Sequence, residues 1–377
     1  MFNTLIGEFC SKNSNYEEIL SKEPYFVKTK RTAINDTDFV MFCYNQINSD
    51  FNNPIVKECR GIIFEEGRWE NPVCHAFDKF FNYGEDFVAD IDWESAKVTE
   101  KIDGSLIKIW KNPDSNNYVI STNGTINAFD APIEDYKYKS FGELFVNAID
   151  ITELLSVVRT YNKSTYMFEL VSPVNRVVVP YEKLQVYFLG ERDFDGKLTS
   201  FTDSECTEEF KSIGVLTPKV FNLKTFEDIV NASKELPWDE EGYVVHDKYN
   251  NRMKIKSPAY VMAHYSRMNG NISKKHLIKV VLENQEEEFL TYCSDYSEAL
   301  NSVKSKMQDY LINCDVYINE CPQTEDRKEY AAFVNTIDEI YRPYLFSCLK
   351  EYRTPEMFTK DWSESKWEKV ISTMNVG

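Results

Sequence analysis

The hydrophobic pattern of the chain changes once along its length, near residues 257–270. Before that point, short apolar runs alternate with turn-forming residues, which is typical of strands. Examples are Arg176–Val179, Gly242–His246 and Arg252–Lys256. Beyond it, apolar residues recur at steps of three and four, which is typical of amphipathic helices. These segments are Ser273–Glu288, Tyr296–Cys314 and Asp326–Tyr341. The sequence therefore predicts an α+β domain of antiparallel sheets with helices over residues 1–262, followed by an all-helical domain over residues 263–377.

The net charge limits how this chain can meet a nucleic acid. The sequence carries 43 lysines and arginines against 61 aspartates and glutamates, a formal net charge of −18. A protein that binds nucleic acid over much of its surface is basic, because lysine and arginine neutralise the phosphates. Any nucleic-acid partner must therefore meet a local positive groove in an acidic body.

The cysteines and histidines form no metal or disulfide pattern. The 9 cysteines, an odd number, include no Cys-x-x-Cys pair, and the 4 histidines show no metal spacing. We therefore expect reduced thiols and a cytoplasmic location, in the host cell if the protein is viral. No basic region followed by a long apolar run opens the chain, so we expect neither a signal peptide nor a membrane span.

Lys101 lies two residues before an Asp-Gly pair, in the stretch Glu100-Lys101-Ile102-Asp103-Gly104-Ser105. This pair predicts a tight turn, because glycine tolerates positive φ and aspartate bonds its own backbone. The turn would place the amine at a strand-to-loop corner. We interpret Lys101 as a nucleophile that takes an adenylyl group from ATP, and a surface hairpin that contains a lysine is the alternative. Neighbouring cations and a bound metal would help the amine to lose its proton.

Lys254 and Lys256 supply such cations. Residues two apart on a strand share a face, so both lysines would point one way and Met253 and Ile255 toward the core. A solvated strand face is the alternative. Just upstream, Glu241 could hold a hydrated divalent cation, or it belongs to an ordinary acidic loop.

Three further charged residues stand beside apolar runs. Glu169 interrupts an apolar segment, and a buried carboxylate needs a partner such as a ribose or a metal. An outward strand position is the alternative. Arg60 and Lys79 each precede aromatic or apolar residues and could reach a leaving pyrophosphate, or each is a surface charge.

Six short motifs follow one another along the first domain. They are Arg60-Gly61, Lys79-Phe80-Phe81-Asn82, Lys101-Ile102-Asp103-Gly104-Ser105, Phe168-Glu169-Leu170-Val171, Glu241-Gly242-Tyr243-Val244 and Lys254-Ile255-Lys256-Ser257. In this order they resemble the covalent nucleotidyltransferase superfamily of ligases and capping enzymes. More narrowly, the chain resembles the RNA ligase 1 family, the bacteriophage tRNA-repair RNA ligases. The narrower likeness rests on Glu58-Cys59-Arg60-Gly61, Pro173-Val174-Asn175-Arg176 and Lys256-Ser257-Pro258-Ala259-Tyr260.

The resemblance implies how a nucleotide would bind. The first domain would be a nucleotidyltransferase domain, an ATP-grasp-like ligase fold, that uses ATP and Mg²⁺. Lys101 would form a lysyl-AMP phosphoramidate, and Glu100 would lie by the adenine. Tyr44, Arg60 and Lys79 would contact the nucleotide and its phosphates.

The resemblance also assigns the remaining site residues. Glu169 would hold the ribose or metal-bound water, and Glu241 would lie near the metal. Lys254 and Lys256 would contact the phosphates and count as catalytic with Lys101 and Glu241. Gly104 would be among the nucleotide-binding residues.

The implied reaction joins an RNA 5′-phosphate to an RNA 3′-hydroxyl through lysyl-AMP and RNA-adenylate, in a monomer that repairs RNA such as nicked tRNA. The helical domain would select the RNA. The alternatives are a DNA ligase, a capping-type nucleotidyltransferase and a non-catalytic RNA-binding module. A DNA ligase or capping enzyme would continue beyond Lys256 as a small β-barrel, which the helical spacing disfavours. One departure from the family stands at Asn123, where these ligases usually carry a basic residue.

Overall fold

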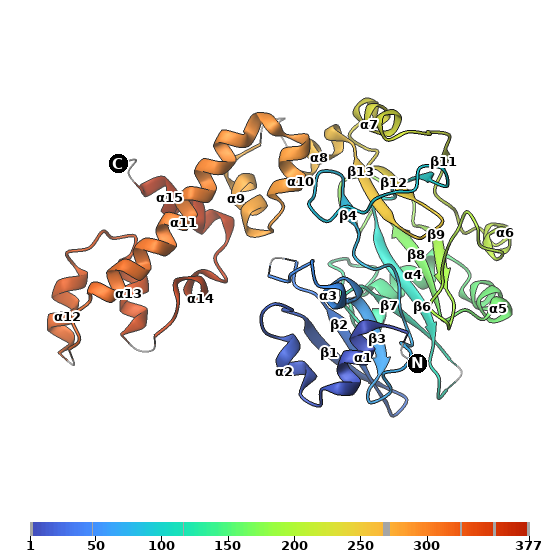
Figure 1. Ribbon diagram of the computed structural model, residues 1–377, viewed down its shortest axis with the longest axis horizontal. Coiled ribbons are helices and arrows are strands. Elements are labelled where there is room, and N and C mark those ends of the chain that lie inside the picture. The colour runs from blue at the N-terminus through green and yellow to red at the C-terminus, as the bar shows by residue number, and fades with distance from the viewer. Residues whose placement is uncertain are drawn as a thin grey trace. The chain divides into compact units, whose positions relative to one another are not determined.

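The computed structural model describes residues 3–46, 48–115, 117–266, 272–324, 326–349 and 352–374. It divides into two compact units, Met1–His264 and Tyr265–Gly377. Figure 1 shows the strands in the first unit and a series of helices in the second. Part of the segment where the hydrophobic pattern changes, residues 267–270, lies outside the described residues.

Three sheets form the framework of the first unit. The first has the order β1 (Lys28–Ile34), β2 (Thr37–Cys43), β3 (Arg60–Glu65). The second has the order β10 (Leu198–Ser200), β9 (Gln185–Arg192), β8 (Thr165–Val171), β6 (Ser105–Lys111), β7 (Tyr118–Thr122). The third has the order β11 (Val220–Phe221), β5 (Lys97–Glu100), β12 (Gly242–His246), β13 (Arg252–Lys256), β4 (Phe81–Asn82). Neighbouring strands are antiparallel except β13 and β4, which are parallel, so the predicted α+β class is confirmed.

Helices bury the apolar faces of these sheets (Figure 1). The helices of the first unit are α1 (Leu5–Lys12), α2 (Tyr16–Leu20), α3 (Pro54–Glu58), α4 (Phe141–Ala148), α5 (Ile151–Tyr161), α6 (Thr207–Ser212) and α7 (Phe226–Glu235), with a 3₁₀ turn at Ala128–Asp130. Helix α8 (Pro258–Ser266) begins in the first unit and includes the first residues of the second. Helices α1 to α3 share a core with β2 and β3, and α4 to α6 share one with β6, β8 and β9. The α7 side chain Ile229 packs with Met253 and Ile255 of β13, so those two residues face the core as predicted.

The second unit is built around one long helix. Its helices are α9 (Lys274–Leu282), α10 (Glu286–Tyr292), α11 (Ser297–Glu320), α12 (Arg327–Val334), α13 (Arg342–Cys348), α14 (Pro355–Thr359) and α15 (Glu364–Thr373), with a 3₁₀ turn at Ser294–Tyr296. The buried side chains of α11 are Leu300, Val303, Met307, Tyr310 and Cys314, which follow the predicted spacing. Among the described helices, none combines the length and apolar character needed to cross a bilayer.

Three local expectations are wrong. The predicted helix Ser273–Glu288 is broken between α9 and α10, where Asn284 takes a left-handed conformation with φ 51° that ends a helix. The predicted helix Asp326–Tyr341 ends at Val334. The segment Arg176–Val179 is not a strand, and the backbone N–H groups of Val178 and Val179 donate to a side chain described below.

Candidate active site

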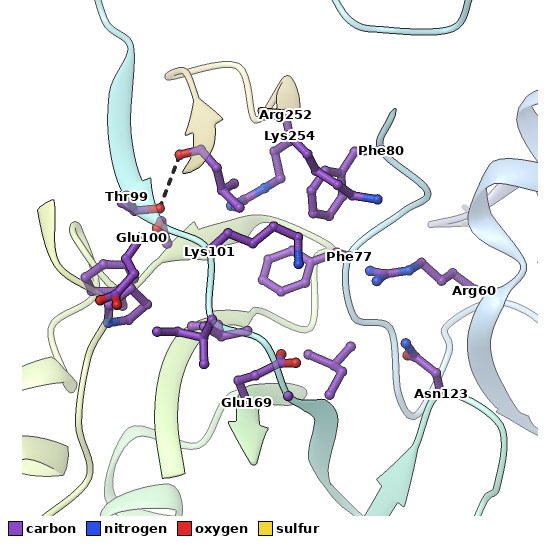
Figure 2. A pocket seen from close by; sticks show the side chains of 18 residues that line it. Arg60, Phe77, Phe80, Thr99, Glu100, Lys101, Asn123, Glu169, Arg252 and Lys254 are labelled. Carbon is purple, nitrogen blue, oxygen red and sulfur yellow. Dashed lines mark hydrogen bonds between the residues drawn. The ribbon is translucent and has the colours of Figure 1, made fainter. Parts of the chain in front are cut away.

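Lys101 follows the last residue of β5, at the corner where the third sheet ends. Its backbone N–H donates to the carbonyl of Gly242 on β12 at 2.9 Å, which fixes the corner to the neighbouring strand. Gly242 has φ 138°, and a Cβ there would lie 2.2 Å from the carbonyl oxygen of Ile255, so only glycine fits between β12 and β13. The Lys101 side chain is 21% exposed and points into a cavity rather than into bulk water (Figure 2).

The turn after Lys101 forms for a different reason from the one predicted. The φ of Gly104 lies outside the left-handed region, but a Cβ there would lie 2.5 Å from the carbonyl oxygen of Leu170 on β8. The Asp103 carboxylate, which is buried, does not bond its own backbone. It accepts hydrogen bonds from the N–H groups of Val178 and Val179 at 2.9 and 2.8 Å, and from the Tyr260 hydroxyl at 2.8 Å. Asp103 therefore connects the turn to Arg176–Val179, the segment that was wrongly predicted to be a strand.

Glu241 links two of the predicted lysines. Its carboxylate lies 2.8 Å from Nζ of Lys101 and 3.9 Å from Nζ of Lys256, and its side chain is only 5% exposed. Burial raises the pKa of Glu241, and the ammonium groups of Lys101 and then Lys256 oppose that rise. The structure thus places a carboxylate of increased proton affinity in direct contact with the candidate nucleophile.

Lys101 opens into a cavity of about 260 Å³. Its lining includes five of the other predicted site residues, which are Arg60, Glu100, Gly104, Glu169 and Lys254. Figure 2 shows Lys101 between Glu100 on one side and Arg60 on the other, with Glu169 pointing toward the same space. These residues come from β3, β5, β8 and β13, or from the loop after β5, so the third and second sheets and β3 meet at this cavity.

The two ends of the cavity differ in chemistry. Near Glu100 the lining includes Pro218, whose neighbour Lys219 donates its N–H to the Glu100 carboxylate at 3.1 Å, and Val244, which pairs with Thr99. Ile102 and Phe201 add further apolar surface to the lining. The other end carries Arg60, Arg252 and Lys254. An apolar end beside a cationic end suits a ligand with a flat base and a chain of phosphates.

Several polar atoms in this lining are buried and without a hydrogen-bond partner among the described residues. They are Nη1 of Arg60, Oδ1 of Asn123, and Nε and Nη2 of Arg252. Buried polar atoms are nearly always paired, so unpaired atoms gathered in one cavity indicate a polar ligand. Asn123 lines the cavity beside Arg60, so the position that departs from the family pattern does face the site.

Glu169 is the most perturbed carboxyl of the cavity. Burial raises its pKa to about 8, the Lys101 ammonium lowers it, and the Glu241 carboxylate raises it further. The described residues contain no cluster of three metal-ligating side chains. The buried carboxylate of Glu241 and the partly buried one of Glu169, beside a cationic wall, nevertheless fit Mg²⁺, which commonly takes one or two carboxylates and completes its shell with water and substrate phosphates.

Lys254 and Phe80 shape the cationic end. Nζ of Lys254 lies 5.0 Å and the guanidinium of Arg60 lies 5.5 Å from the centre of the Phe80 ring. Burial lowers the pKa of Lys254 well below its ordinary value, and the charges of Lys79 and Lys101 lower it further. These cations lie close together and repel one another, and a bound anion would reduce this electrostatic repulsion.

Four of the predicted site residues are not part of the cavity lining: Tyr44, Lys79, Glu241 and Lys256. Tyr44 and Lys79 lie together, with Nζ of Lys79 5.4 Å from the Tyr44 ring centre and 3.2 Å from Oε1 of Gln46. Glu241 and Lys256 connect to the cavity through Lys101, which Glu241 contacts directly. The cavity is also lined by three residues that were not among the predicted site residues, Phe77, Phe80 and Arg252. Arg252 is two residues before Lys254 on β13, so the same-face rule applied to Lys254 and Lys256 would have found it.

Comparison with known proteins identifies the class of this molecule. Residues 58–260, more than half of the chain, match the family model described as RNA ligase. The chain therefore belongs to the RNA ligase family, as its ordered motifs predicted.

Two curated relatives support this assignment. A putative bifunctional polynucleotide kinase/RNA ligase of Autographa californica nuclear polyhedrosis virus is 28% identical over 315 residues, which are 78% of this chain and 42% of that protein. An RNA ligase of Rhodothermus phage RM378 is 25% identical over 317 residues, which are 68% of this chain and 70% of that protein. The chain thus spans less than half the length of the baculovirus relative and over two thirds of the phage one.

Solved structures agree on the fold. Form 1 of an archaeal ATP-dependent RNA ligase matches with a TM-score of 0.51 at 12% identity, over 97% of this chain and 98% of that chain. Form 2 matches with a TM-score of 0.50 at 14% identity, over 79% of this chain and 76% of that chain. These identities are low, so the likeness establishes a shared ligase fold and nothing finer.

Proposed function

We propose that this chain is an ATP-dependent RNA ligase that works through a lysyl-AMP intermediate. In the first step the Lys101 amine attacks the α-phosphorus of ATP, a P–N bond forms, the α–β P–O bond breaks, and pyrophosphate leaves. In the second step an RNA 5′-phosphate oxygen attacks the same phosphorus, the P–N bond breaks, and RNA-adenylate forms. In the third step an RNA 3′-hydroxyl attacks the 5′-phosphate and AMP leaves. The observation that carries the proposal is the Lys101 amine, 2.8 Å from Glu241, in a cavity lined by Arg60 and Lys254.

The proton of Lys101 needs an acceptor before the amine can attack. Glu241 is in contact with Nζ, and burial raises the pKa of its carboxyl, so Glu241 takes the proton in the first step and returns it in the second. Arg60 and Lys254 stabilise the charge on the phosphates while the cavity keeps the reacting groups in line. The Glu100 end holds the adenine, which leaves the triphosphate at the cationic end.

Glu169 and Glu241 are the residues that would hold Mg²⁺, directly or through water. When bound, the ion would neutralise the charge of the phosphates. We also propose that the helical unit selects the RNA, that the substrate is a broken RNA such as nicked tRNA, and that the protein acts as a monomer in the cytoplasm. We further propose that the boundary between the nucleotidyltransferase domain and the helical domain lies between residues 262 and 263.

Incubation with radiolabelled ATP and Mg²⁺ tests the central step. The expected result is a mass increase of one AMP, mapped to the peptide that contains Lys101 and absent in Lys101→Ala. Lys97→Ala is the matched control, because Lys97 is the first residue of β5, the strand that leads to Lys101, but lies outside the nucleotide cavity and pairs with Asp203. Label from GTP in place of ATP would indicate a capping-type enzyme. No label from any nucleotide would leave a non-catalytic RNA-binding module.

Ligation itself distinguishes the remaining alternative. An oligoribonucleotide with a 5′-phosphate and a 3′-hydroxyl should be joined, whereas the same oligonucleotide with a 5′-hydroxyl should not. Sealing of a nicked DNA duplex with no sealing of RNA would identify a DNA ligase instead.

A further inference from the structure

A second cavity of about 310 Å³ adjoins the nucleotide cavity. The two share Phe77, Phe80 and Arg252 in their walls, and Figure 2 shows these three side chains on the side of Lys101 opposite Glu100. The proposed adenylylation of Lys101 requires neither this second cavity nor most of the residues that line it.

The wall of the second cavity is strongly cationic. Its basic side chains are Lys57, Lys79, Arg192, Lys197 and Arg252, and its carboxylate is Asp78. Asp78 binds His75 at 2.8 Å and lies 4.0 Å from Arg192. Within the part of the chain that the structure describes, no carboxylate lies within ion-pair distance of Lys57, Lys197 or Arg252. In a protein with a formal net charge of −18, such a group of cations is a specific feature rather than a general surface property.

Arg252 is built to contact a ligand. It is 8% exposed, its guanidinium lies 4.6 Å from the centre of the Phe77 ring, and its Nε and Nη2 atoms have no partner among the described residues. Arg192, also 8% exposed, donates to the carbonyls of Gly196 and Ala76 and keeps its Nε without a described partner. A planar guanidinium with two free N–H groups is well suited to a phosphate.

Aromatic rings stand between these cations. Nζ of Lys57 lies 5.9 Å from the ring centres of both Phe81 and Phe87, and these rings line the cavity with Phe77 and Phe80. Interleaved rings and cations bind single-stranded nucleic acid, because bases stack and phosphates pair with charge. A pyrophosphate has no base to stack, so this wall favours an RNA strand over the tail of ATP.

We propose that the second cavity binds the 5′-phosphorylated end of the RNA. This proposal rests on the proposed ligase function. Both pyrophosphate departure and 5′-phosphate attack occur in line with the Lys101 P–N bond, so both groups occupy the side of the phosphorus opposite Lys101. Arg252, in the wall shared by the two cavities, contacts each in turn. Lys57 and Lys197 line the second cavity but not the first, so they contact the RNA phosphates alone.

The double variant Lys57→Ala/Lys197→Ala tests the assignment in the full-length protein. We measure binding of 5′-phosphorylated and 5′-hydroxyl oligoribonucleotides by fluorescence anisotropy at several salt concentrations. The Kd of the phosphorylated strand should rise about tenfold, and the slope of log Kd against log salt should fall by about 1.4, about 0.7 for each lost phosphate contact. The preference for the 5′-phosphate should shrink, while the rate of self-adenylylation with ATP stays within about twofold of wild type.

Two companion proteins separate charge from folding. Lys57→Arg/Lys197→Arg keeps the charge and should restore binding. Lys234→Ala removes one exposed lysine on α7, outside both cavities, and should bind RNA like wild type.

Two results would overturn the proposal. One is an unchanged Kd and unchanged preference for the 5′-phosphate in the double alanine variant. The other is a raised KM for ATP with intact RNA affinity, which would assign the cavity to the polyphosphate tail of ATP. The two proposals can also fail separately. If the wild type takes no label from ATP, while the double alanine variant loses the preference for a 5′-phosphate, the ligase function is refuted and the RNA site is supported.

Discussion

Replacing Glu169 with glutamine tests whether this carboxyl is protonated in the unliganded protein. Burial, with the Glu241 carboxylate and against the Lys101 ammonium, raises the pKa of Glu169 from 4.5 to about 8. Between these two values the folded protein keeps a proton that the unfolded chain releases. The free energy of unfolding therefore falls as pH rises, by about 1.4 kcal/mol for each pH unit.

The size of the effect follows from these two pKa values. At pH 5 the variant should be more stable than the wild type by only about 0.8 kcal/mol, apart from any change in packing. At pH 7 the variant should be more stable by about 3 kcal/mol, because an amide has no proton to release on unfolding. Above pH 8 the difference should become constant. A divalent cation that binds the carboxylate should reduce the pH dependence in wild type and leave the variant unchanged.

Urea denaturation of both proteins at pH 5, 6, 7 and 8 measures this difference. Glu182→Gln is the matched control, because it removes the same formal charge from an exposed position, and it should follow wild type. If the stabilities of wild type and Glu169→Gln change in parallel from pH 5 to pH 8, Glu169 is charged in the folded state and the reasoning about its burial is wrong.

Three other substitutions follow from the site geometry. Asp103→Ala leaves three hydrogen-bond donors without their acceptor and should lower the free energy of unfolding by about 3–5 kcal/mol. Tyr260→Phe removes one of these bonds and should cost about 1–2 kcal/mol, with both variants measured by urea denaturation. A smaller loss in Asp103→Ala than in Tyr260→Phe would contradict this prediction. Gly104→Ala forces a Cβ to 2.5 Å from a carbonyl oxygen on β8 and should lower the free energy of unfolding by about 2 kcal/mol or more, with loss of most of the self-adenylylation rate. A variant with the stability and rate of the wild type would show that the turn can adjust without cost. Asn123→Lys adds a cation to the nucleotide cavity and should lower the KM for ATP by up to about tenfold in steady-state assays. The reason is that a charge-assisted hydrogen bond contributes about 1.5 kcal/mol. An unchanged KM would mean that this position does not contact the phosphates.

Short-range rules predicted two strands beside the site correctly. Strands β12 and β13 have the predicted bounds, because turn-forming residues mark both ends of each apolar run. The alternation of side chains on β13 correctly sent Met253 and Ile255 into the core. The ordered motifs were enough to identify the family, because six weak signals in a fixed order seldom occur by chance.

The direction of side chains outside regular strands could not be predicted from the sequence. Lys79 and Phe80 are adjacent in an irregular segment before β4, and nothing local decides which of them faces the nucleotide cavity. In the structure Phe80 lines that cavity, and Lys79 turns toward Tyr44 and the second cavity. Likewise, the partners of Asp103 lie 75, 76 and 157 residues away in the chain, so a local turn was the only interpretation that the sequence offered.

In the proposed reaction, the Lys101–Glu241 ion pair would keep the Lys101 amine unreactive until a nucleotide binds. At 2.8 Å from a buried carboxylate, the Lys101 ammonium is held as a salt and has no lone pair to attack with. Phosphates bound by Arg60 and Lys254 would bring the α-phosphorus to the Lys101 amine, and the proton would pass to Glu241 as the P–N bond forms. Transfer of the proton would therefore depend on bound ATP. Glu241→Gln should therefore lower the rate of self-adenylylation without lowering ATP affinity to the same extent, because the amide can hold Lys101 in place but cannot take its proton.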